Sequence, residues 1–400
     1  MNAETLLSTR PGTSDAMLDA VRRIARDVAA PHAAAVDAEA RFPIETLSAL
    51  RNAQLLSAQL PIELGGGALG MRALGQIVST LAEDCASSAM VLAMHFNQVA
   101  CLARHGRHDP DIAAFLQRLA REQLLVASMT SEVGTSGDTR RSVCAVQQVD
   151  GHFVLEKQAT TGSYCEQADA ILVTARRSAD ASPNDQVLVL VERGQRTLDR
   201  RSDWDTMGMR GTCSPAFGLK ACGPSGQVLT TPFAEIAMLS LVPYSHILWS
   251  ALWTGIAAGA ARKAGAFVRQ QARRSPGEVP PSALRLAALT ADLQGMRSQW
   301  QAAADAFDRA VAQGADMQIF SSLQWALRMN NLKVGSSEAA PKVVHAALQV
   351  IGVMGYRNDS PFSVSREYRD ALSGALMISN DRLNAASASI VLVSKGEAEQ

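Results

Sequence analysis

The chain has 400 residues, of which 47% are hydrophobic and 19% are charged, and its formal net charge at pH 7 is zero. This composition supports large buried cores and argues against an intrinsically disordered chain. The balanced charge predicts no basic surface, so we expect no nucleic-acid partner. The length allows two or three domains.

The cysteines and the most apolar stretch indicate a cytoplasmic protein. The six cysteines show neither a CxxC pair nor a metal-ligand spacing, so we expect buried thiols, a reducing compartment and no metal site. The first residues lack the pattern of a signal peptide. The apolar stretch 236–260 is interrupted by Pro243, Tyr244, Ser245 and His246, which favours a buried helix over a membrane span.

Residues 1–123 are predicted to form an N-terminal helical domain. Apolar residues recur at helical spacing from Asp15 to Ala29, and Pro31 is expected to end that helix. The glycine-rich stretch Pro61–Gly70 is a sharp connection, because no Lys-Ser/Thr follows it as in a phosphate-binding loop. The expected helices are 15–29, 43–55, 71–84 and 85–105.

Residues 124–238 are predicted to form a compact antiparallel β domain, a barrel or a sandwich. Short β-rich runs alternate here with turns such as Asp150-Gly151. The predicted strands are 124–129, 143–148, 152–155, 170–175, 186–191, 216–220 and 227–229.

Residues 239–400 return to helical periodicity and predict a C-terminal four-helix bundle. The complete chain is therefore an α+β multidomain protein in the order helices, sheet, helices. The expected bundle helices are 244–272, 281–312, 317–352 and 366–394.

Two loops in the β region are rich in Ser, Thr and Gly. They are 128–138 (SMTSEVGTSGD) and 157–169 (KQATTGSYCEQAD). Their hydroxyls and backbone N–H groups could bind a polar ring or a phosphate. Each segment alone is more often a simple turn.

Three further segments allow two interpretations each. In 207–212 (MGMRGT), Arg210 could bind an anion or tie its loop to a carboxylate. The glycines of 349–356 (QVIGVMGY) could end a helix or let the backbone approach a cofactor closely. In 366–382 (REYRDALSGALMISNDR), the final Asn380-Asp381 pair could cap a helix or present polar groups to a cavity.

The order of these segments resembles the acyl-CoA dehydrogenase superfamily over roughly residues 15–393. The loop 157–169 is also similar to the version of this motif in the family's monooxygenase branches. The segments that carry the resemblance are Phe42-Pro43 with Pro61–Gly67, then 131–138, 157–168, 207–212, 255–258, 349–356 and Arg369-Asp370.

The resemblance implies an FAD site between the β domain and the helical bundle. Its flavin-ring contacts fall on Met129, Thr130, Ser131, Thr160 and Thr161. The hydroxyls of the four Ser and Thr residues suit the polar edge of a reduced flavin.

The remaining cofactor contacts fall in the C-terminal region. Gln349, Gly352 and Gly355 match the family's adenosine-diphosphate contact, and Arg273 matches an arginine that meets the FAD of a neighbouring subunit. Pro276 replaces an aromatic residue of the latter motif. An FAD site shared between subunits implies a homodimer or a homotetramer.

The usual catalytic glutamate is absent from both places where the family carries it. Counting eight residues from Asp370 gives Ile378, and counting back from Gly255 gives Ser245, with His246 at the usual arginine. In the family this carboxylate removes the α-proton of an acyl thioester while hydride passes to the flavin.

Three hypotheses follow from this departure. In the first, Asp381 serves as the base from a shifted loop, and the protein dehydrogenates the α,β-bond of an acyl-CoA or acyl-carrier thioester and passes electrons to an acceptor. In the second, it is a monooxygenase that uses reduced flavin from a reductase and O2, and His246 contacts oxygen or another small-molecule substrate. In the third, it binds flavin without catalysis.

Simpler roles remain open for these residues. His246 could be a satisfied core histidine, and Asp381 could be a helix cap. Gly137 replaces a serine that meets the CoA side of the substrate in the family, which leaves room for a carrier-protein thioester.

Overall fold

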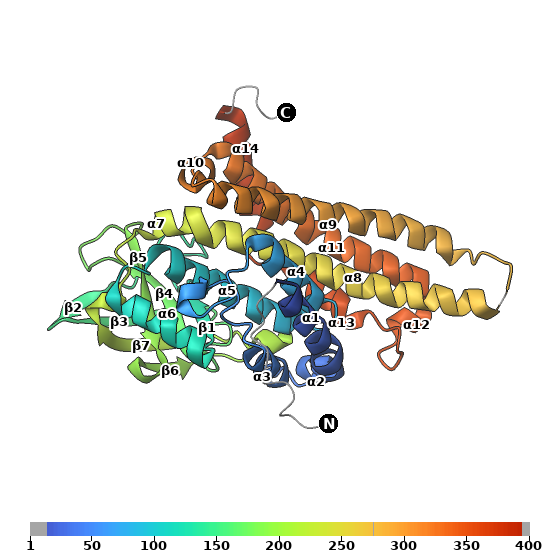
Figure 1. The fold of residues 1–400 in the computed structure, drawn as a ribbon, viewed down its shortest axis with the longest axis horizontal. Helices are drawn as coiled ribbons and strands as arrows, with labels where there is room; N and C mark the ends of the chain where they lie inside the picture. Colours follow the sequence, from blue (N-terminus) through green and yellow to red (C-terminus); the bar gives the residue numbers. More distant parts are fainter. Residues whose placement is uncertain (1–13, 275, 394–400) are drawn as a thin grey trace.

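The computed structural model describes residues 14–274 and 276–393, in which helical regions flank a central sheet region. Long helices lie side by side and extend to one end of the molecule, and the strands gather at the opposite end (Figure 1). The long helices are α8 (Val242–Arg274), α9 (Ser282–Ala312) and α11 (Leu323–Ile351).

The N-terminal helices pack beside α8, and the first of them is longer than predicted. Pro31 does not end it, because a π turn, η2 (Ala25–Ala29), leads directly into the next helix. Pro31 lies in the first turn of that next helix, where its missing N–H costs little. The helices are α1 (Ser14–Ile24), α2 (Ala30–Ala38), α3 (Ile44–Asn52), α4 (Met71–Ala82), α5 (Ala86–His105) and α6 (Pro110–Glu122).

The strands form two open sheets. The three-stranded sheet has the order β1-β4-β5, and the four-stranded sheet has the order β2-β3-β7-β6. The first comprises β1 (Val126–Met129), β4 (Ala170–Arg176) and β5 (Gln186–Glu192). The second comprises β2 (Gln147–Val149), β3 (His152–Ala159), β6 (Arg196–Arg200) and β7 (Phe217–Pro224).

Several predictions about the β region were wrong. The sheets are not closed into a barrel, and β1 pairs with β4 in parallel, with Val126 opposite Ala170. Residues 227–229 contribute only an isolated bridge, and most of 143–148 lies outside β2. The sequence analysis missed β6, whose side chains are mostly exposed and polar, because such an edge strand lacks the apolar alternation that marks half-buried strands.

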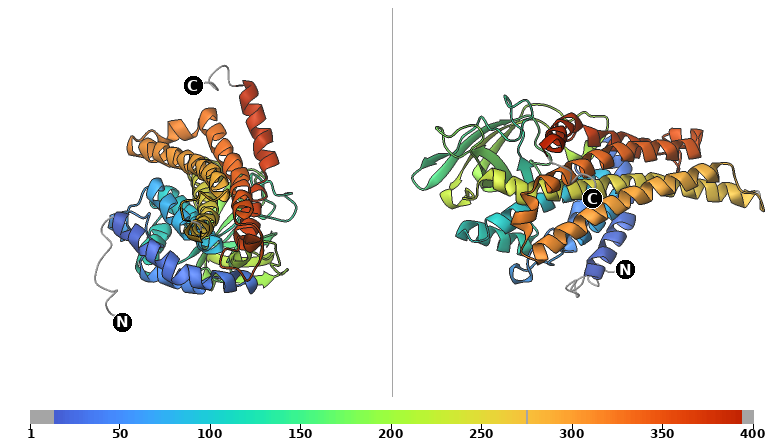
Figure 2. Two further views of the ribbon diagram at one scale, coloured as in Figure 1. Left: turned by 90° about the vertical axis from the view of Figure 1, so that its right-hand side faces the viewer. Right: turned by 90° about the horizontal axis from the view of Figure 1, so that it is seen from above.

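The predicted helix 366–394 is divided. Its halves are α13 (Ser365–Leu372) and α14 (Asn380–Val393), separated by a short 3-10 turn, η8 (Ser373–Ala375), and by Ile378 at a φ of +53°. Helix α14 projects away from the long helices in both directions of view (Figures 1 and 2). The remaining short helices are α7 (Phe233–Ile236), α10 (Asp316–Phe320) and α12 (Val353–Tyr356).

Helix α8 is the central helix of the C-terminal region. Among the described residues, the segment Phe233–Arg274 and helix α5 are long and apolar enough to cross a membrane, but most of each lies buried inside the protein. A Cβ on Gly255 would lie 2.3 Å from the Ser79 carbonyl oxygen of α4, so the glycine permits close helix packing. The predicted buried helix is therefore confirmed.

The cysteine prediction was only partly right. Four thiols are buried, but Cys213 is half-buried and Cys222 is exposed. Cys222 lies on β7, where alternate side chains face outward, so the strand period explains its exposure.

Candidate functional site

Two predicted flavin-contact loops meet where β1 and β3 end. The Ser131 hydroxyl donates to the Thr161 carbonyl at 2.9 Å and accepts the Thr161 N–H at 3.0 Å. The hydroxyls of Thr130 and Ser128 lie 3.0 Å apart. Thr160 is exposed and Met129 is fully buried, so Met129 can contribute only its backbone to a surface ligand. The structure thus joins the two loops through Ser131 and Thr161.

A buried ion pair supports these loops from beneath. Lys157 Nζ lies 3.3 Å from Glu132 Oε2 and donates to the Thr174 carbonyl at 2.8 Å. Glu132 also accepts the Ser142 hydroxyl at 2.6 Å. Burial raises the pKa of Glu132, but the Lys157 charge and the donated hydrogen bonds outweigh it, so the net shift is downward. Both partners are hydrogen-bonded and hold the loops in place.

The segment 207–212 docks against the Arg369-Asp370 pair. Asp370 Oδ1 accepts the Met209 N–H at 2.6 Å, and Arg369 donates to the Met207 carbonyl at 2.7 Å. Arg210 donates to Asp205 at 2.9 Å and to the Asp37 carbonyl at 2.8 Å. Of the two interpretations of Arg210, the structure supports the one in which it ties its loop.

His246 presents an unpaired nitrogen inside α8. Ser245 Oγ lies 3.0 Å from His246 Nδ1 and donates its own proton to the Val242 carbonyl at 3.0 Å. With the Ser245 proton on the Val242 carbonyl, Nδ1 carries the ring proton, and Nε2, which is buried and has no partner among the described residues, has a free lone pair. Burial and the Lys333 charge lower the pKa of His246 to about 3, so the ring is neutral.

A buried lysine, not a carboxylate, marks the place where the resemblance expects a glutamate. Lys333 of α11 donates to the Ile378 carbonyl at 2.6 Å, to the Gly374 carbonyl at 2.9 Å and to Asn380 Oδ1 at 2.7 Å. Burial lowers the pKa of Lys333 to about 8. The region around His246 and Ile378 thus holds a buried ammonium group and a neutral imidazole, and Glu338, which accepts from Asn380 Nδ2 at 3.3 Å, is the acidic neighbour of this cluster.

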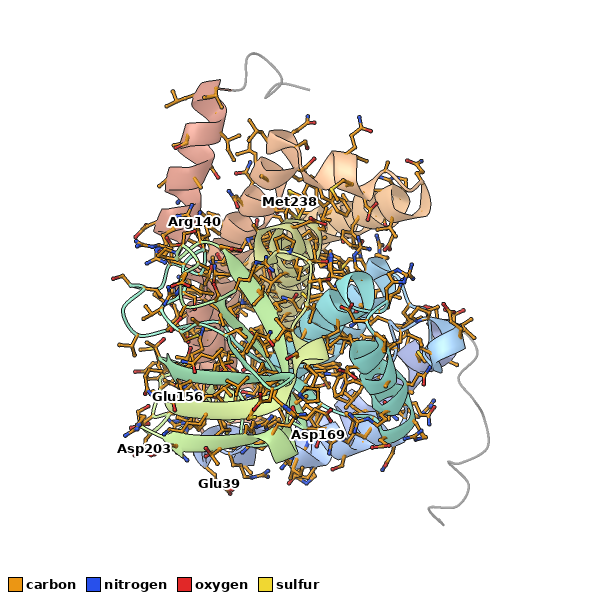
Figure 3. The ribbon with its side chains drawn as sticks, turned by 90° about the vertical axis from the view of Figure 1, so that its left-hand side faces the viewer. Glu39, Arg140, Glu156, Asp169, Asp203 and Met238 are labelled. Carbon is orange, nitrogen blue, oxygen red and sulfur yellow. The ribbon has the colours of Figure 1, made fainter. Side chains whose placement is uncertain are left out.

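Asp381 lies exposed in the first turn of α14, where a carboxylate also interacts favourably with the helix dipole. The next residue, Arg382, donates to the carbonyl oxygens of Ser136 and Gly137 and so joins α14 to the β region. Arg140 of the same loop lies beneath α14 in Figure 3. Asn380 does not cap the helix with its side chain, which binds Lys333 and Ser337.

The predicted adenosine-diphosphate contacts lie far from the strands. Arg273 and Gln349 are exposed, and Gln349 bonds to His345 at 3.1 Å. They lie in the last turns of α8 and α11, and these helix ends are at the opposite end of the molecule from the strands (Figure 1). Gly352 ends α11 at a φ of +72°, which confirms the helix-cap interpretation, and Gly355 is buried. One chain does not bring these residues together with Ser131 and Thr161.

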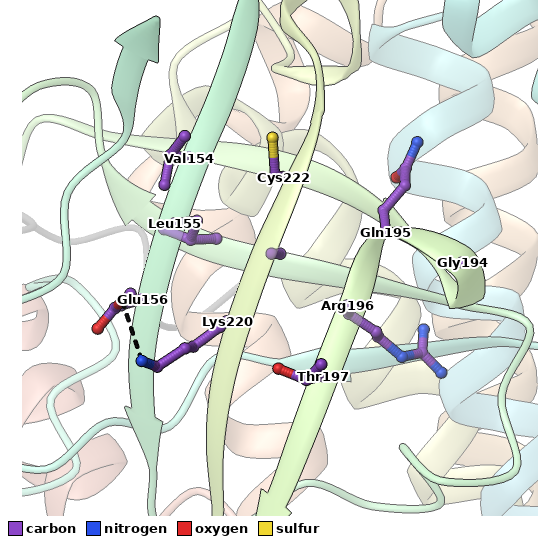
Figure 4. A pocket seen from close by; sticks show the side chains of 10 residues that line it. Val154, Leu155, Glu156, Gly194, Gln195, Arg196, Thr197, Lys220 and Cys222 are labelled. Carbon is purple, nitrogen blue, oxygen red and sulfur yellow. Dashed lines mark ion pairs between the residues drawn. The ribbon is translucent and has the colours of Figure 1, made fainter.

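Two hollows on the surface lie elsewhere. One of about 460 Å³ lies over the outer face of β3, β6 and β7, where Lys220 pairs with Glu156 at 3.5 Å (Figure 4). Another of about 490 Å³ is lined by Asp138, Arg140, Arg141, Pro183 and Asn184. Neither includes His246 or Lys333. Within residues 14–274 and 276–393, no cluster of three His, Cys, Asp or Glu side chains could hold a metal.

Two family models match the chain. Residues 12–123 match the N-terminal domain of acyl-CoA dehydrogenase, and residues 236–377 match its C-terminal domain. Together they cover more than half of the sequence. The chain belongs to the acyl-CoA dehydrogenase superfamily.

Relatives within the acyl-CoA dehydrogenase superfamily carry different names. The amino sugar nitrososynthase DnmZ of Streptomyces peucetius is 28% identical, over 85% of this chain and 84% of its own. The mitochondrial isovaleryl-CoA dehydrogenase of Oryza sativa subsp. japonica is 24% identical, over 90% of this chain and 86% of its own. FMN-bound TdsC from Paenibacillus sp. A11-2 is 18% identical, with a TM-score of 0.80 over 94% of this chain and 97% of its own, which shows the shared fold.

The residues fit the flavin that acyl-CoA dehydrogenase family proteins bind. The half-buried Ser131 hydroxyl and the exposed Thr161 hydroxyl lie in a frame fixed by the Glu132–Lys157 pair. Hydroxyls held in this way can meet the polar edge of a flavin without reorganising. The unpaired His246 Nε2 is a further buried atom that a bound group would satisfy.

The sequence analysis missed Lys333 as a site residue. It lies on the buried face of α11 with Met329 and Ser337, four residues to either side. A lysine in an apolar register of a predicted helix is a signal that could have identified it, because isolated lysines are rarely fully buried.

Proposed function

We propose that the protein is a flavin-dependent monooxygenase, the second of the hypotheses based on the sequence. The observation that carries this proposal is the replacement of both family glutamates, by Ile378 and Ser245, in a region that holds the Lys333 ammonium and neutral His246. The 28% identity to a nitrososynthase, whose name describes oxidation at an amine nitrogen, supports the same direction.

The charge at the site argues against proton abstraction from a thioester. A base for that step needs a carboxylate whose pKa is raised toward that of the α-carbon. The Lys333 charge would lower the pKa of any carboxylate close to it. Monooxygenation needs no base of this kind.

Bound reduced flavin would supply the two electrons for the overall change of substrate–H, O2 and reduced flavin into substrate–OH, water and oxidised flavin. The protein's part is to bind and orient. Ser131 and Thr161 would hold the polar edge of the flavin. His246 Nε2 is suited to accept a hydrogen bond from a substrate N–H or O–H, and its neutral state means that it does not compete for the proton.

The cofactor in this proposal is FAD shared between subunits. Arg273, Gln349, Gly352 and Gly355 would then meet the FAD of another chain, since they lie at the end of α8, the end of α11 and in α12, at the opposite end of the molecule from the strands (Figure 1). A homodimer or homotetramer would also cover the exposed apolar end of α14, where Leu392 is 87% exposed. A reductase in the cytoplasm would supply the reduced flavin.

Acyl-thioester dehydrogenation is the second candidate. It is favoured by Asp381, which directly follows the Lys333-bound segment, and by the relative named isovaleryl-CoA dehydrogenase. The exposure of Asp381 weighs against it, because the base for this step has to be held in a desolvated site against the substrate.

Two reactions on the purified flavin-loaded protein separate these functions. The first mixes it anaerobically with butyryl-CoA, isovaleryl-CoA and a butyryl carrier-protein thioester. The second supplies reduced flavin and O2 with an amino sugar or with dibenzothiophene, a substrate class named for a structural neighbour. We expect no bleaching in the first reaction and an oxygenated product, detected by its added mass, in the second.

Bleaching by a thioester without any oxygenated product would overturn the monooxygenase proposal. In that event the variant D381N tests whether Asp381 is the base that removes the α-proton. Loss of bleaching in D381N would assign this role to Asp381, and unchanged bleaching would exclude Asp381 from it. Equal rates with CoA and carrier-protein thioesters would contradict a carrier preference linked to Gly137. A protein that binds flavin and gives neither outcome with the probe set would match the non-catalytic hypothesis.

A further inference from the structure

Lys333 uses all three donors of its ammonium group on one short segment of chain. It is fully buried, and its acceptors are two backbone carbonyls and one side-chain amide between Gly374 and Asn380. In the described part of the chain no carboxylate lies within ion-pair distance of it. The nearest influence of this sign is Glu338, which accepts from Asn380 Nδ2 at 3.3 Å.

Neutral partners make this an unusual way to bury a lysine. A charge removed from water is costly unless it is paired, and here backbone and amide dipoles alone replace its hydration. A hydrophobic side chain at this position would leave the Gly374 and Ile378 carbonyls without their Lys333 donor, and Asn380 Oδ1 with the Ser337 hydroxyl alone. The burial of the Lys333 ammonium group therefore requires the acceptors of the segment 374–380, and the conformation of that segment requires the Lys333 donors.

The segment itself is strained at Ile378. This β-branched residue has a φ of +53°, in the left-handed region that such side chains rarely adopt. Its carbonyl accepts the shortest of the three Lys333 bonds, at 2.6 Å. The family count places the missing catalytic glutamate at the same residue. The bond to Lys333 thus holds the main chain in an unfavourable conformation where the family carries its base.

Lys333 also faces the polar side of α8. Its Nζ lies 5.7 Å from the centroid of the Trp253 ring, and its charge contributes to keeping His246 neutral. One side chain of α11 therefore contacts both the turn before α14 and the helix that carries the unpaired His246 nitrogen.

We propose that Lys333 is a positioning residue that fixes the segment 374–380, and through it Ile378, against the His246 face of α8. The oxygenation readout of this inference rests on the proposed function. Its structural readout, the mobility of the segment 374–380, does not rest on that function. A failure of the positioning role can therefore be distinguished from a failure of the proposed monooxygenase function.

The test compares K333M with K342M, which makes the same change at an exposed position of α11. We expect K333M to speed amide exchange in peptides covering 374–380 by about tenfold or more, since the Gly374 and Ile378 carbonyls lose their Lys333 donor. Product formed per reduced flavin should fall by about the same factor, while flavin binding through the β loops changes less than about twofold. K342M should match the natural protein in all three.

A folded K333M protein with unchanged exchange in 374–380 would overturn the inference, and so would faster exchange with an unchanged yield of product per reduced flavin. If K333M does not fold, N380D provides the second test. A carboxylate beside Lys333 should raise the pKa of its ammonium group above about 8, so the activity lost when Lys333 deprotonates should be lost at a higher pH than in the natural protein. His246 and Glu338 are the other titratable groups that face Lys333. An unmoved limb in a folded N380D protein would contradict the proposal.

If the natural protein forms no oxygenated product, the exchange experiment still decides the positioning role. The thioester-bleaching rate then takes the place of product yield in the comparison of K333M with K342M.

Discussion

At the scale of single residues, the site is defined by side chains whose charges are fixed by their surroundings. The Ser245 hydroxyl contacts Nδ1 of His246 and leaves Nε2 for a ligand, while burial and Lys333 keep the ring neutral. An acceptor held in this way suits a substrate that brings a donor. The same position is occupied by an arginine in the family pattern, so the change removes a positive charge and replaces a hydrogen-bond donor by an acceptor.

Replacing His246 by leucine should therefore reduce activity without unfolding the protein. We expect H246L to lower kcat/KM for the oxygenated substrate by about tenfold or more, the effect of losing one buried acceptor. The natural protein should lose stability as pH falls from 6.5 toward 3, because the unfolded chain binds a proton at this histidine before the folded one does.

The pH dependence separates a role in the site from a general packing defect. The melting temperature of H246L minus that of the natural protein should increase as the pH is lowered from 7 to 5, because only the natural protein loses stability from this histidine. Differential scanning fluorimetry would measure both temperatures. A constant difference across this range, or unchanged kcat/KM, would contradict the assignment of a neutral acceptor. H345L is a control at an exposed histidine of α11.

At the scale of elements, the helices could be predicted from periodicity and motif order, whereas the pairing of the strands could not. The long helices and the resemblance were accessible from the sequence, and the resemblance assigned Ser131 and Thr161 to one flavin without predicting the hydrogen bonds that join their loops. The direction of β1 relative to β4 was not, because apolar runs buried on both faces look alike in parallel and antiparallel sheets. The break before α14 was also hidden, because it depends on Lys333 binding the Ile378 carbonyl across 45 residues of sequence.

The contact between the 207–212 segment and α13 depends on a glycine. A Cβ on Gly208 would lie 2.3 Å from the Arg369 carbonyl oxygen, a backbone atom that cannot easily move aside. G208A should lower the free energy of unfolding by about 1–3 kcal/mol through overpacking. Thermal and urea denaturation would measure it.

A second glycine provides the matched comparison. Gly295 lies inside exposed α9 with nothing near its Cβ position, so G295A should raise stability by about 0.5–1 kcal/mol through helix propensity. If G208A proved as stable as G295A, the close approach of the 207–212 segment to α13 would not be a stabilising constraint.

At the scale of the whole molecule, three distant parts of the chain meet around Asp370. Arg369 forms an ion pair with Asp37 of α2, and Asp370 accepts the Met209 N–H of the sheet region, so the start of the last helical segment binds both preceding regions. Such contacts set the orientation of the helical regions around the sheets, and hence of α8 against the flavin-contact loops.

Asp370 should make the stability of the protein depend on pH. Burial raises its pKa to about 7, against the opposing effects of the Met209 hydrogen bond and Arg366. Between about pH 4 and 7 the folded state binds this proton more tightly than the unfolded state, so stability falls as pH rises through that window and then levels off. A tenfold difference in proton affinity between the two states corresponds to about 1.4 kcal/mol.

The variant D370N removes this pH dependence, while its amide oxygen can still accept the Met209 N–H. The melting temperature of D370N minus that of the natural protein should therefore increase from pH 5 to about pH 7.5 and then stay constant. D292N, at an exposed aspartate of α9, supplies the control for loss of a surface charge. A flat difference for D370N would show that the carboxyl ionises in the folded protein as readily as in the unfolded chain, and that its contact with Met209 is an ordinary charge-assisted hydrogen bond.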